Sequence, residues 1–222
     1  MFLLIDKPGG MTSHGVVDVV RKITGEKRVG HGGTLDPLAT GILIVGVGRE
    51  STKKLGGVSL GKDKTYRATI VLGEEKDTDD AEGKTISVDP KKIKEMDLNK
   101  VLSKFRGEIV QTPPNFSAVK IEGKKAYEIS RSGGRPKIEP RKVTIHLIKL
   151  LSFSYPEFEI ECRVTSGTYI RSLARDIGKS LGTFGYIKKL RRTAVGEIEI
   201  KDCVLLEKLT PENWNSLARH DL

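Results

Sequence analysis

The sequence is poor in the residues that build disulfide frameworks and structural metal sites. It has two cysteines, Cys162 and Cys203, which form no Cys-x-x-Cys pair, and its four histidines lack the spacing of metal ligands. We therefore expect no zinc site and no other bound metal. Cys162 alternates with apolar residues at 158, 160 and 164, which is typical of a buried strand position.

Long apolar runs are also missing. The N-terminus is apolar for only four residues before Asp6 and Lys7, which is unlike a signal peptide. No apolar run approaches ~18 residues, the length expected of a membrane-spanning helix. We therefore expect a cytoplasmic protein that does not enter a membrane.

Aromatic residues make up only 5% of the chain, whereas Lys and Arg exceed Asp and Glu by 39 to 29, a net charge of +10. Few aromatics argue against a stacking platform for unpaired strands, and the excess of cations favours a polyanionic partner. Residues 120–149 carry nine Lys or Arg against three Glu, and a second basic cluster lies at 188–192. Two separated clusters indicate a folded RNA held through its phosphates.

Two other ligand classes have weak support. The chain has no Gly-x-x-x-x-Gly-Lys-Ser/Thr motif, and Gly30–Gly33 lacks the Gly-x-Gly-x-x-Gly spacing of a dinucleotide site. The acids between Asp77 and Gly83 suggest calcium, but an EF-hand needs glycine where Glu82 stands. We interpret that segment as a turn.

Helical and strand periods alternate along the chain, and its 222 residues suit one sizeable domain or two small ones. Strands separated by irregular spans, with helices between some of them, predict an α+β fold with a mixed sheet. The expected helices are one capped by Ser13 and stopped by Gly25, one capped by Asp97, and one over 170–181 ended by Gly182; the expected strands are 66–73, 143–149 and 157–165.

The most informative segment is Gly-His-Gly-Gly-Thr-Leu-Asp-Pro-Leu-Ala-Thr-Gly at residues 30–41. Its glycines permit close approach of the backbone to a ligand, and Pro37 biases Asp36 away from helix. A single acid held on such a turn can act as a nucleophile or a base, although most isolated Asp-Pro pairs are structural.

The complete string, with four others in the same order, resembles the TruB family of pseudouridine synthases, which isomerise a uridine in the T loop of transfer RNA. The other four are Lys7-Pro8 with Thr12-Ser13-His14, Lys64-Thr65-Tyr66-Arg67, Ser166-Gly167-Thr168-Tyr169-Ile170-Arg171-Ser172-Leu173, and Leu190-Arg191-Arg192-Thr193. Together they span residues 3 to about 198, nearly the whole chain.

The resemblance implies the pseudouridine synthase fold: a largely antiparallel central sheet flanked by helices, in a single catalytic domain over residues 1–222. It implies an RNA-pinching helical insertion at about 111–140. Residues 199–222 are too few for the RNA-binding PUA domain of many relatives, so we expect a short extension there and a weaker grip on RNA.

The resemblance also implies the site. Asp36 is the expected nucleophile, Tyr66 stacks on the target base and accepts a proton, and Arg171 pairs with Asp36. Whether Asp36 attacks the sugar, attacks the base or assists elimination at C2′ stays open. Without the resemblance, Arg171 near a helix start is expected to be a solvated surface group.

Further substrate-binding residues follow from the same resemblance. His31 is expected to hold the RNA after base flipping, and Asp80 to join the arginine–aspartate network. Tyr169 and Leu190 are expected to line the pocket around the base, and Lys7 with Pro8 to brace the catalytic loop.

The expected partner is the T-arm stem–loop of transfer RNA, bound by a monomer that needs no cofactor and no protein partner. Guide-RNA-dependent members of the family depend on a PUA domain and partner proteins, which favours a stand-alone enzyme here. The alternatives are a non-catalytic RNA-folding module, against which Asp36, Tyr66 and Arg171 together argue, and a nucleotide-phosphate enzyme, which the glycine spacing disfavours.

Overall fold

The computed structural model describes residues 1–59 and 61–222, which divide into two compact units. Unit 1 comprises Met1–Arg67 and Leu190–Leu222, and unit 2 comprises Ala68–Lys189. Strands β4 (Lys64–Leu72) and β12 (Gly185–Val195) have residues in both units. The expectation of a single domain therefore stays a prediction.

Unit 1 is built on a mixed sheet. Its strand order is β14-β1-β3-β12, with β2 on β3 and β13 on β12. The pairs β1–β3 and β2–β3 are antiparallel, whereas β1–β14 and β3–β12 are parallel. The strands are β1 Phe2–Lys7, β2 Val29–Gly32, β3 Thr40–Val47, β13 Ile198–Glu199 and β14 Val204–Leu205. The two parallel pairs make the sheet mixed rather than wholly antiparallel, and its longer pairings are antiparallel, in agreement with the largely antiparallel sheet expected from the resemblance.

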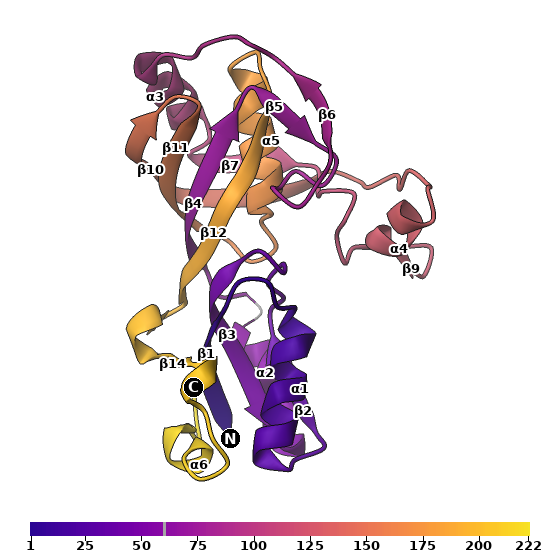
Figure 1. Cartoon of the computed structure of the whole chain (residues 1–222), viewed down its shortest axis with the longest axis vertical. Coiled ribbons are helices and arrows are strands. Elements are labelled where there is room, and N and C mark those ends of the chain that lie inside the picture. The colour runs from indigo at the N-terminus through magenta and orange to yellow at the C-terminus, as the bar shows by residue number, and fades with distance from the viewer. Residues whose placement is uncertain (60) are drawn as a thin grey trace. The chain divides into compact units, whose positions relative to one another are not determined.

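Alternating side chains of β1 and β3 enter two hydrophobic clusters. Leu3 and Ile5 pack with Val16 and Val20 of helix α1 (Ser13–Thr24), whereas Phe2 and Leu4 pack with Leu55 of helix α2 (Arg49–Ser59). Because strand side chains alternate between faces, this sheet is buried on both faces. Short helices η1 (Ile200–Asp202), η2 (Leu206–Lys208) and α6 (Trp214–Leu217) complete unit 1 (Figure 1).

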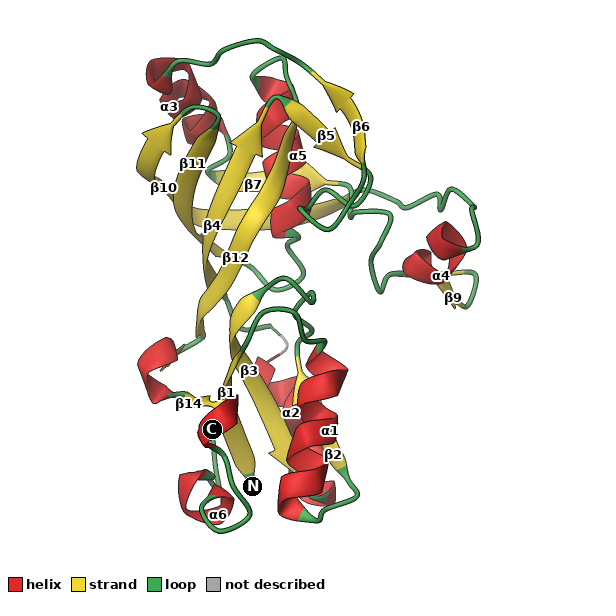
Figure 2. Ribbon diagram, in the orientation of Figure 1, coloured by secondary structure: helices red, strands yellow, loops and turns green. Residues whose placement is uncertain are grey.

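Unit 2 carries the strand order β4-β11-β10-β7, in which β10–β11 and β10–β7 are antiparallel. Figure 2 shows these strands with helices α3 and α5 in the same unit. The regular strands and helices are β5 Glu74–Lys76, β6 Thr85–Val88, α3 Glu95–Lys104, β7 Gly107–Gln111, β10 Arg141–Ser154, β11 Glu157–Val164 and α5 Ile170–Ser180. Gly178 of α5 lies so close to the backbone of Phe184 and Gly185 that a Cβ there would be 2.4 Å from Phe184 C.

The segment expected as an insertion, 111–140, contains only short elements. They are the hairpin β8 Lys120–Ile121 with β9 Lys124–Lys125, followed by helix α4 Ala126–Arg131. Figure 1 shows α4 and β9 standing away from the rest of unit 2. Five of the basic side chains in this segment are exposed: Lys120, Lys124, Arg131, Arg135 and Lys137.

Most elements expected from periodicity are confirmed, with two corrections at helix starts. Gly25 ends α1 in the left-handed conformation, as expected, but the N-cap is Thr12, whose side chain accepts from Gly15 N. Helix α3 begins at Glu95 with Lys94 as N-cap, so Asp97 lies inside its first turn. Cys162 is fully buried in β11, as expected. Among the described residues, no helix has the length and apolar character needed to cross a membrane.

Candidate active site

Asp36 lies in a tight turn between β2 and β3. Ala39 N donates to Asp36 O at 3.0 Å, which closes a four-residue turn with Pro37 in its second position. Gly10 N donates to Pro37 O at 3.0 Å, so the turn is attached to the loop after β1. The Asp36 side chain is partly exposed. The carboxylate of Asp36 is thus carried by a backbone with a defined shape.

Lys7 holds the backbone of this turn through a hydrogen bond. It is fully buried at the end of β1, and its Nζ donates to Pro8 O at 2.8 Å, Met11 O at 2.5 Å and Pro37 O at 3.2 Å. A buried ammonium group is costly unless its donors are satisfied, and here backbone carbonyls from three positions accept them. Lys7 is thus attached to the backbone of the Asp36 turn at Pro37.

Two further side chains, to which we assigned no role at the site from the sequence, hold backbone next to Asp36. Ser13, expected to be a helix cap, is instead buried, and its hydroxyl exchanges two hydrogen bonds with the backbone of Leu35. Arg192 is 2% exposed and donates to Ile42 O at 2.8 and 2.6 Å and to Gly33 O at 3.1 Å. Only their places in the quoted motifs distinguish them in the sequence.

Strand β12 approaches β3 closely beside the turn. Arg192 pairs with Gly41, whose φ is +101°, and a Cβ on Gly41 would lie 2.2 Å from Arg192 O. The preceding Arg191 donates from two nitrogens to Asp6, at 3.1 and 2.6 Å. Glycine is therefore required at position 41 for the register that brings Arg192 under the turn.

Lys64, at the start of β4, is a buried cation of the same unit. Its Nζ donates to Ser59 O at 2.7 Å and Lys62 O at 2.8 Å, and Ser59 Oγ in turn donates to Gly32 O at 3.1 Å. Burial, with the charge of Arg192 as a smaller cause, lowers the pKa of Lys64 to about 8. The glycine-rich segment is thus surrounded by cations bonded to backbone oxygens.

His31 lies on β2, paired with Val45. Burial, with smaller contributions from His14 and Arg192, lowers the pKa of His31. Its Nδ1 is buried and has no hydrogen-bond partner within the described residues. The imidazole is therefore neutral near pH 7.

Two expected pocket residues of unit 1 lie on its shared strands. Tyr66 of β4 is 8% exposed and Leu190 of β12 is 7% exposed. Tyr66, Ala68, Ile70 and Leu72 are all buried, which agrees with the strand expected over 66–73.

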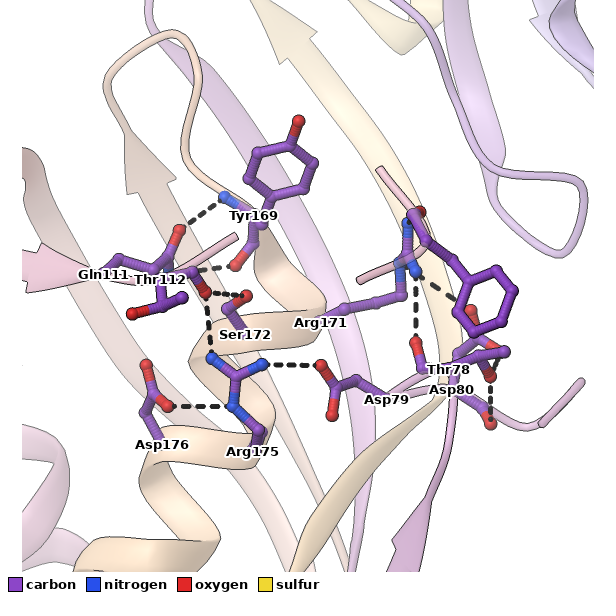
Figure 3. Close-up of polar contacts among 11 residues, drawn as sticks. Thr78, Asp79, Asp80, Gln111, Thr112, Tyr169, Arg171, Ser172, Arg175 and Asp176 are labelled. Atoms are coloured by element: carbon purple, nitrogen blue, oxygen red, sulfur yellow. Dashed lines mark hydrogen bonds and ion pairs between the residues drawn. The ribbon is translucent and has the colours of Figure 1, made fainter. Parts of the chain in front are cut away.

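In unit 2, Arg171 occupies the first turn of α5 but is buried rather than solvated (Figure 3). Its Nη1 donates to Thr78 O at 3.1 Å and its Nη2 donates to Phe116 O at 3.0 Å. Its Nε lies 3.7 Å from Asp80 Oδ2. Arg171 thus joins the 77–83 turn and the segment after β7, two stretches distant in sequence.

Asp80 is 4% exposed and organises the turn around itself. Its Oδ1 accepts from Thr78 Oγ1 at 2.6 Å and from Glu82 N at 3.1 Å. On its other side the turn pairs with β12, because Ile187 N donates to Asp79 O at 3.1 Å. The expectation of a turn at 77–83 is confirmed, and the structure brings Asp80 to Arg171.

Tyr169 immediately precedes α5 and is held by Gln111, another residue we did not single out from the sequence. Gln111 is fully buried, accepts from Tyr169 N at 2.8 Å and donates to Tyr169 O at 3.0 Å. The guanidinium of Arg141 lies 4.8 Å from the Tyr169 ring centroid, within the range of a cation–π contact. Gln111 therefore fixes the start of the helix that carries Arg171.

The expected residues thus gather in two groups. Lys7, His31, Asp36, Tyr66 and Leu190 belong to unit 1, whereas Asp80, Tyr169 and Arg171 belong to unit 2. The pairing of Asp36 with Arg171 joins the two units and stays a prediction. Across the described residues no cluster of three or more His, Cys, Asp or Glu side chains is arranged to hold a metal.

Comparison with known proteins supplies the family. The model of the TruB family pseudouridylate synthase N-terminal domain matches residues 21–170, and that of the tRNA pseudouridylate synthase B C-terminal domain matches residues 171–221. The tRNA pseudouridine synthase B of Aquifex aeolicus (strain VF5) is 45% identical over 95% of this chain and 74% of that protein. That of Azoarcus sp. (strain BH72) is also 45% identical, over 93% of this chain and 68% of that protein.

Solved structures agree. One chain in the crystal structure of a Cbf5-Nop10-Gar1 complex matches this chain with a TM-score of 0.73 and 31% sequence identity. The match covers 94% of this chain and 53% of that chain. The archaeal box H/ACA sRNP Nop10-Cbf5 complex gives 0.71 and 27%, over 96% of this chain and 54% of its own. This chain thus spans about half the length of those chains. From the family models and the curated relatives, the chain belongs to the TruB family of pseudouridylate synthases, which are isomerases.

Proposed function

We propose that this protein isomerises uridine 55 in the T loop of transfer RNA to pseudouridine. Family membership and relatives named tRNA pseudouridine synthase B support the substrate class. The observation that carries the proposal is the Asp36 turn, whose backbone and flanking segment are held by Lys7, Ser13 and Arg192. Such preorganisation is what a nucleophile needs when it must meet one sugar or base carbon.

The reaction requires no redox change and no activated donor. The bond between C1′ and N1 of uracil breaks, the base rotates, and a bond between C1′ and C5 forms. The C5 proton leaves and N1 gains a proton, so atoms balance without a cofactor. In our proposal the Asp36 carboxylate supplies the negative charge or covalent bond that stabilises the intermediate.

A flipped base must be held while it rotates. We assign stacking and the C5 proton to Tyr66 of β4, and the apolar wall to Leu190 of β12, both of which are largely buried. Tyr169 supports the pocket from the start of α5. His31, neutral near pH 7, fills the space that the base leaves.

We assign to Arg171 the role of stabilising the negative charge of the Asp36 carboxylate. Burial against a base raises the pKa of a carboxylic acid, and a guanidinium nearby opposes that rise. Arg171 suits this role because carbonyl oxygens of Thr78 and Phe116 already hold its Nη atoms in place. Asp80 adds an ion pair at 3.7 Å that fixes the third nitrogen, Nε.

The net charge of +10 and the exposed cations of 120–137 support binding of the T-arm stem–loop. In our proposal the hairpin β8–β9 and helix α4 contact its phosphates. The enzyme acts as a monomer, without a protein partner and without a cofactor.

The test is tritium release from a T-arm stem–loop in which only uridine 55 carries tritium at C5. Wild type is compared under single turnover with Asp36→Asn and with Asp221→Asn, an exposed acid that serves as control. We expect release by wild type and Asp221→Asn, and a loss of about 10⁴-fold or more for Asp36→Asn. Release at the wild-type rate by Asp36→Asn would assign the nucleophile elsewhere.

Binding of the same RNA is measured in parallel. If neither wild type nor Asp36→Asn releases tritium, yet both bind the stem–loop tightly, the catalytic proposal fails. A non-catalytic RNA-folding protein would then be the remaining explanation.

A further inference from the structure

Two arginines of α5 hold successive residues of one turn. Arg171 and Arg175 lie one helical turn apart on the same face of α5, as Figure 3 shows. Arg171 donates to Thr78 O at 3.1 Å, and Arg175 Nη1 donates to Asp79 Oδ2 at 2.8 Å. The turn that carries Asp80 is therefore attached to α5 at two adjacent points.

The contact of Asp79 is unusual for a turn residue. Its side chain is only 12% exposed, and its backbone has a φ of +61°, a conformation that costs most residues free energy. Ile187 N donates to its carbonyl oxygen, so β12 holds the backbone while Arg175 holds the carboxylate. A short turn rarely needs a buried charge to form.

Arg175 also contacts residues outside the turn, one of which attaches α5 to the segment after β7 independently of Asp79. Its Nε donates to Asp176 Oδ1 at 3.2 Å and its Nη2 donates to Thr112 O at 2.9 Å. Ser172 Oγ donates to the same Thr112 O at 2.8 Å. If Asp79 loses its charge, Arg175 keeps these contacts, and α5 stays attached to the segment after β7.

We propose that the Asp79–Arg175 ion pair is a positioning device for Arg171. It fixes the 78–80 turn against α5, and thereby fixes the Thr78 carbonyl and the Asp80 carboxylate that orient the Arg171 guanidinium. The inference rests on the proposed function, in which Arg171 stabilises the charge of Asp36. Neither Asp79 nor Arg175 touches the substrate in this proposal.

The position of the Arg171 guanidinium depends on the position of the 78–80 turn. Its hydrogen bond to Thr78 O and its ion pair with Asp80 both end on this turn, whereas its bond to Phe116 O ends on the segment after β7. If the turn shifts by an ångström, two of these three contacts change together. A guanidinium displaced that far loses much of its effect on a reacting carboxylate.

The test uses Asp79→Asn, which removes the charge and keeps a residue that tolerates positive φ. Its companions are Arg175→Gln and Arg175→Lys, and the control is Lys179→Gln, which removes an exposed charge from the same helix. For each variant we measure single-turnover tritium release, the Kd for the stem–loop and the Tm. We expect Asp79→Asn and Arg175→Gln to slow release about tenfold, with Kd changed less than about threefold.

Arg175→Lys is expected to fall between wild type and Arg175→Gln, because an ammonium group reaches Asp79 but cannot also donate to Thr112 O. Lys179→Gln is expected to match wild type. A variant series in which only Tm falls, with release below the Tm unchanged, would show a purely structural pair and overturn the proposal.

A double-mutant cycle with Arg171→Lys decides whether the pair acts through Arg171. If it does, adding Asp79→Asn to Arg171→Lys slows release no further. Independent, multiplying effects would overturn the proposal. Failure of wild type itself to release tritium would instead refute the proposed function, so the two failures are distinguishable.

Discussion

The hydroxyl of Ser13 and the backbone of Leu35 form a closed two-bond ring: Leu35 N donates to Ser13 Oγ at 2.8 Å, and Ser13 Oγ donates to Leu35 O at 2.9 Å. Both bonds are buried, and Leu35 directly precedes Asp36. The first residue of α1 therefore fixes the backbone that leads into the candidate nucleophile.

Ser13→Ala is expected to remove both bonds and leave a buried N–H and C=O of Leu35 without that partner. The expected loss is about 1–3 kcal/mol in the free energy of unfolding, with tritium release slowed about tenfold. Thr12→Ala is the matched control, because it removes the N-cap of the same helix. It is expected to cost about 1 kcal/mol with release unchanged. Equal effects of the two variants on release would contradict a role for Ser13 in the Asp36 turn.

Gly41→Ala is expected to disrupt unit 1. The new methyl group would lie 2.2 Å from Arg192 O, at a φ of +101°. Since backbone rather than a flexible side chain is in the way, we expect a loss of about 3 kcal/mol or more, measured by chemical denaturation. Gly57→Ala is the control, because Gly57 lies in α2 with no atom within 4 Å of an added Cβ. That change is expected to be neutral or to stabilise by up to about 1 kcal/mol.

Gln111→Leu is expected to weaken the start of α5. Tyr169 N loses its acceptor and Tyr169 O loses one donor, in a partly buried position that has no side-chain cap. We expect a loss of about 2 kcal/mol and slower tritium release, because Arg171 lies two residues further on. Asn99→Leu replaces an exposed amide on α3 and is expected to change stability by less than about 0.5 kcal/mol. If both variants unfold alike, Gln111 has no special place at the helix start.

Asp79 is expected to make stability depend on pH. Burial raises its pKa from 3.8 to about 6, although Arg175 and Arg171 oppose the shift. Of the neighbouring charges only Asp176 adds to it. The folded protein holds the proton of the Asp79 carboxyl group more tightly than the unfolded chain does. Protonation of Asp79 therefore stabilises the folded protein, and this contribution is complete below pH 4. It is lost as the pH rises through 6.

Denaturation of wild type and Asp79→Asn at pH 4, 5, 6 and 7 measures this effect. The free energy of unfolding of wild type is expected to fall relative to that of the variant over this range, by up to about 3 kcal/mol. Parallel curves would mean that the carboxyl group has an ordinary pKa in the folded protein.

Much of the fold is accessible from the sequence because helical and strand periods are local. Gly25 ends α1, and alternating burial along β4 follows the pattern of Tyr66, Ala68 and Ile70. Helix starts are harder to predict, because Thr12 and Ser13 are both good caps and only the tertiary partner Leu35 separates their roles. The parallel pairing of β3 with β12 joins residues 151 positions apart, beyond any local pattern.

The candidate site divides in the same way. Asp36 stands out because glycines and a proline surround it, and Asp80 and Arg171 stand out only through a family motif. Gln111 and Arg175 carry no such mark: a glutamine before two prolines and an arginine on an amphipathic helix are common surface residues. Gln111 is distinguished by its burial and by its bonds to Tyr169, 58 positions away, and Arg175 by its bond to Asp79, 96 positions away.

The turn that presents Asp36 has a further consequence for protein engineering. Its shape is encoded by side chains at positions 7, 13 and 192, none of which lies inside the segment 30–41. Transplanted into another scaffold, that segment alone would carry the carboxylate but not the carbonyl-bound cations and the hydroxyl that determine its backbone. The segment 30–41 is therefore not sufficient to transfer this turn to another protein. A graft also has to include the side chains at positions 7, 13 and 192.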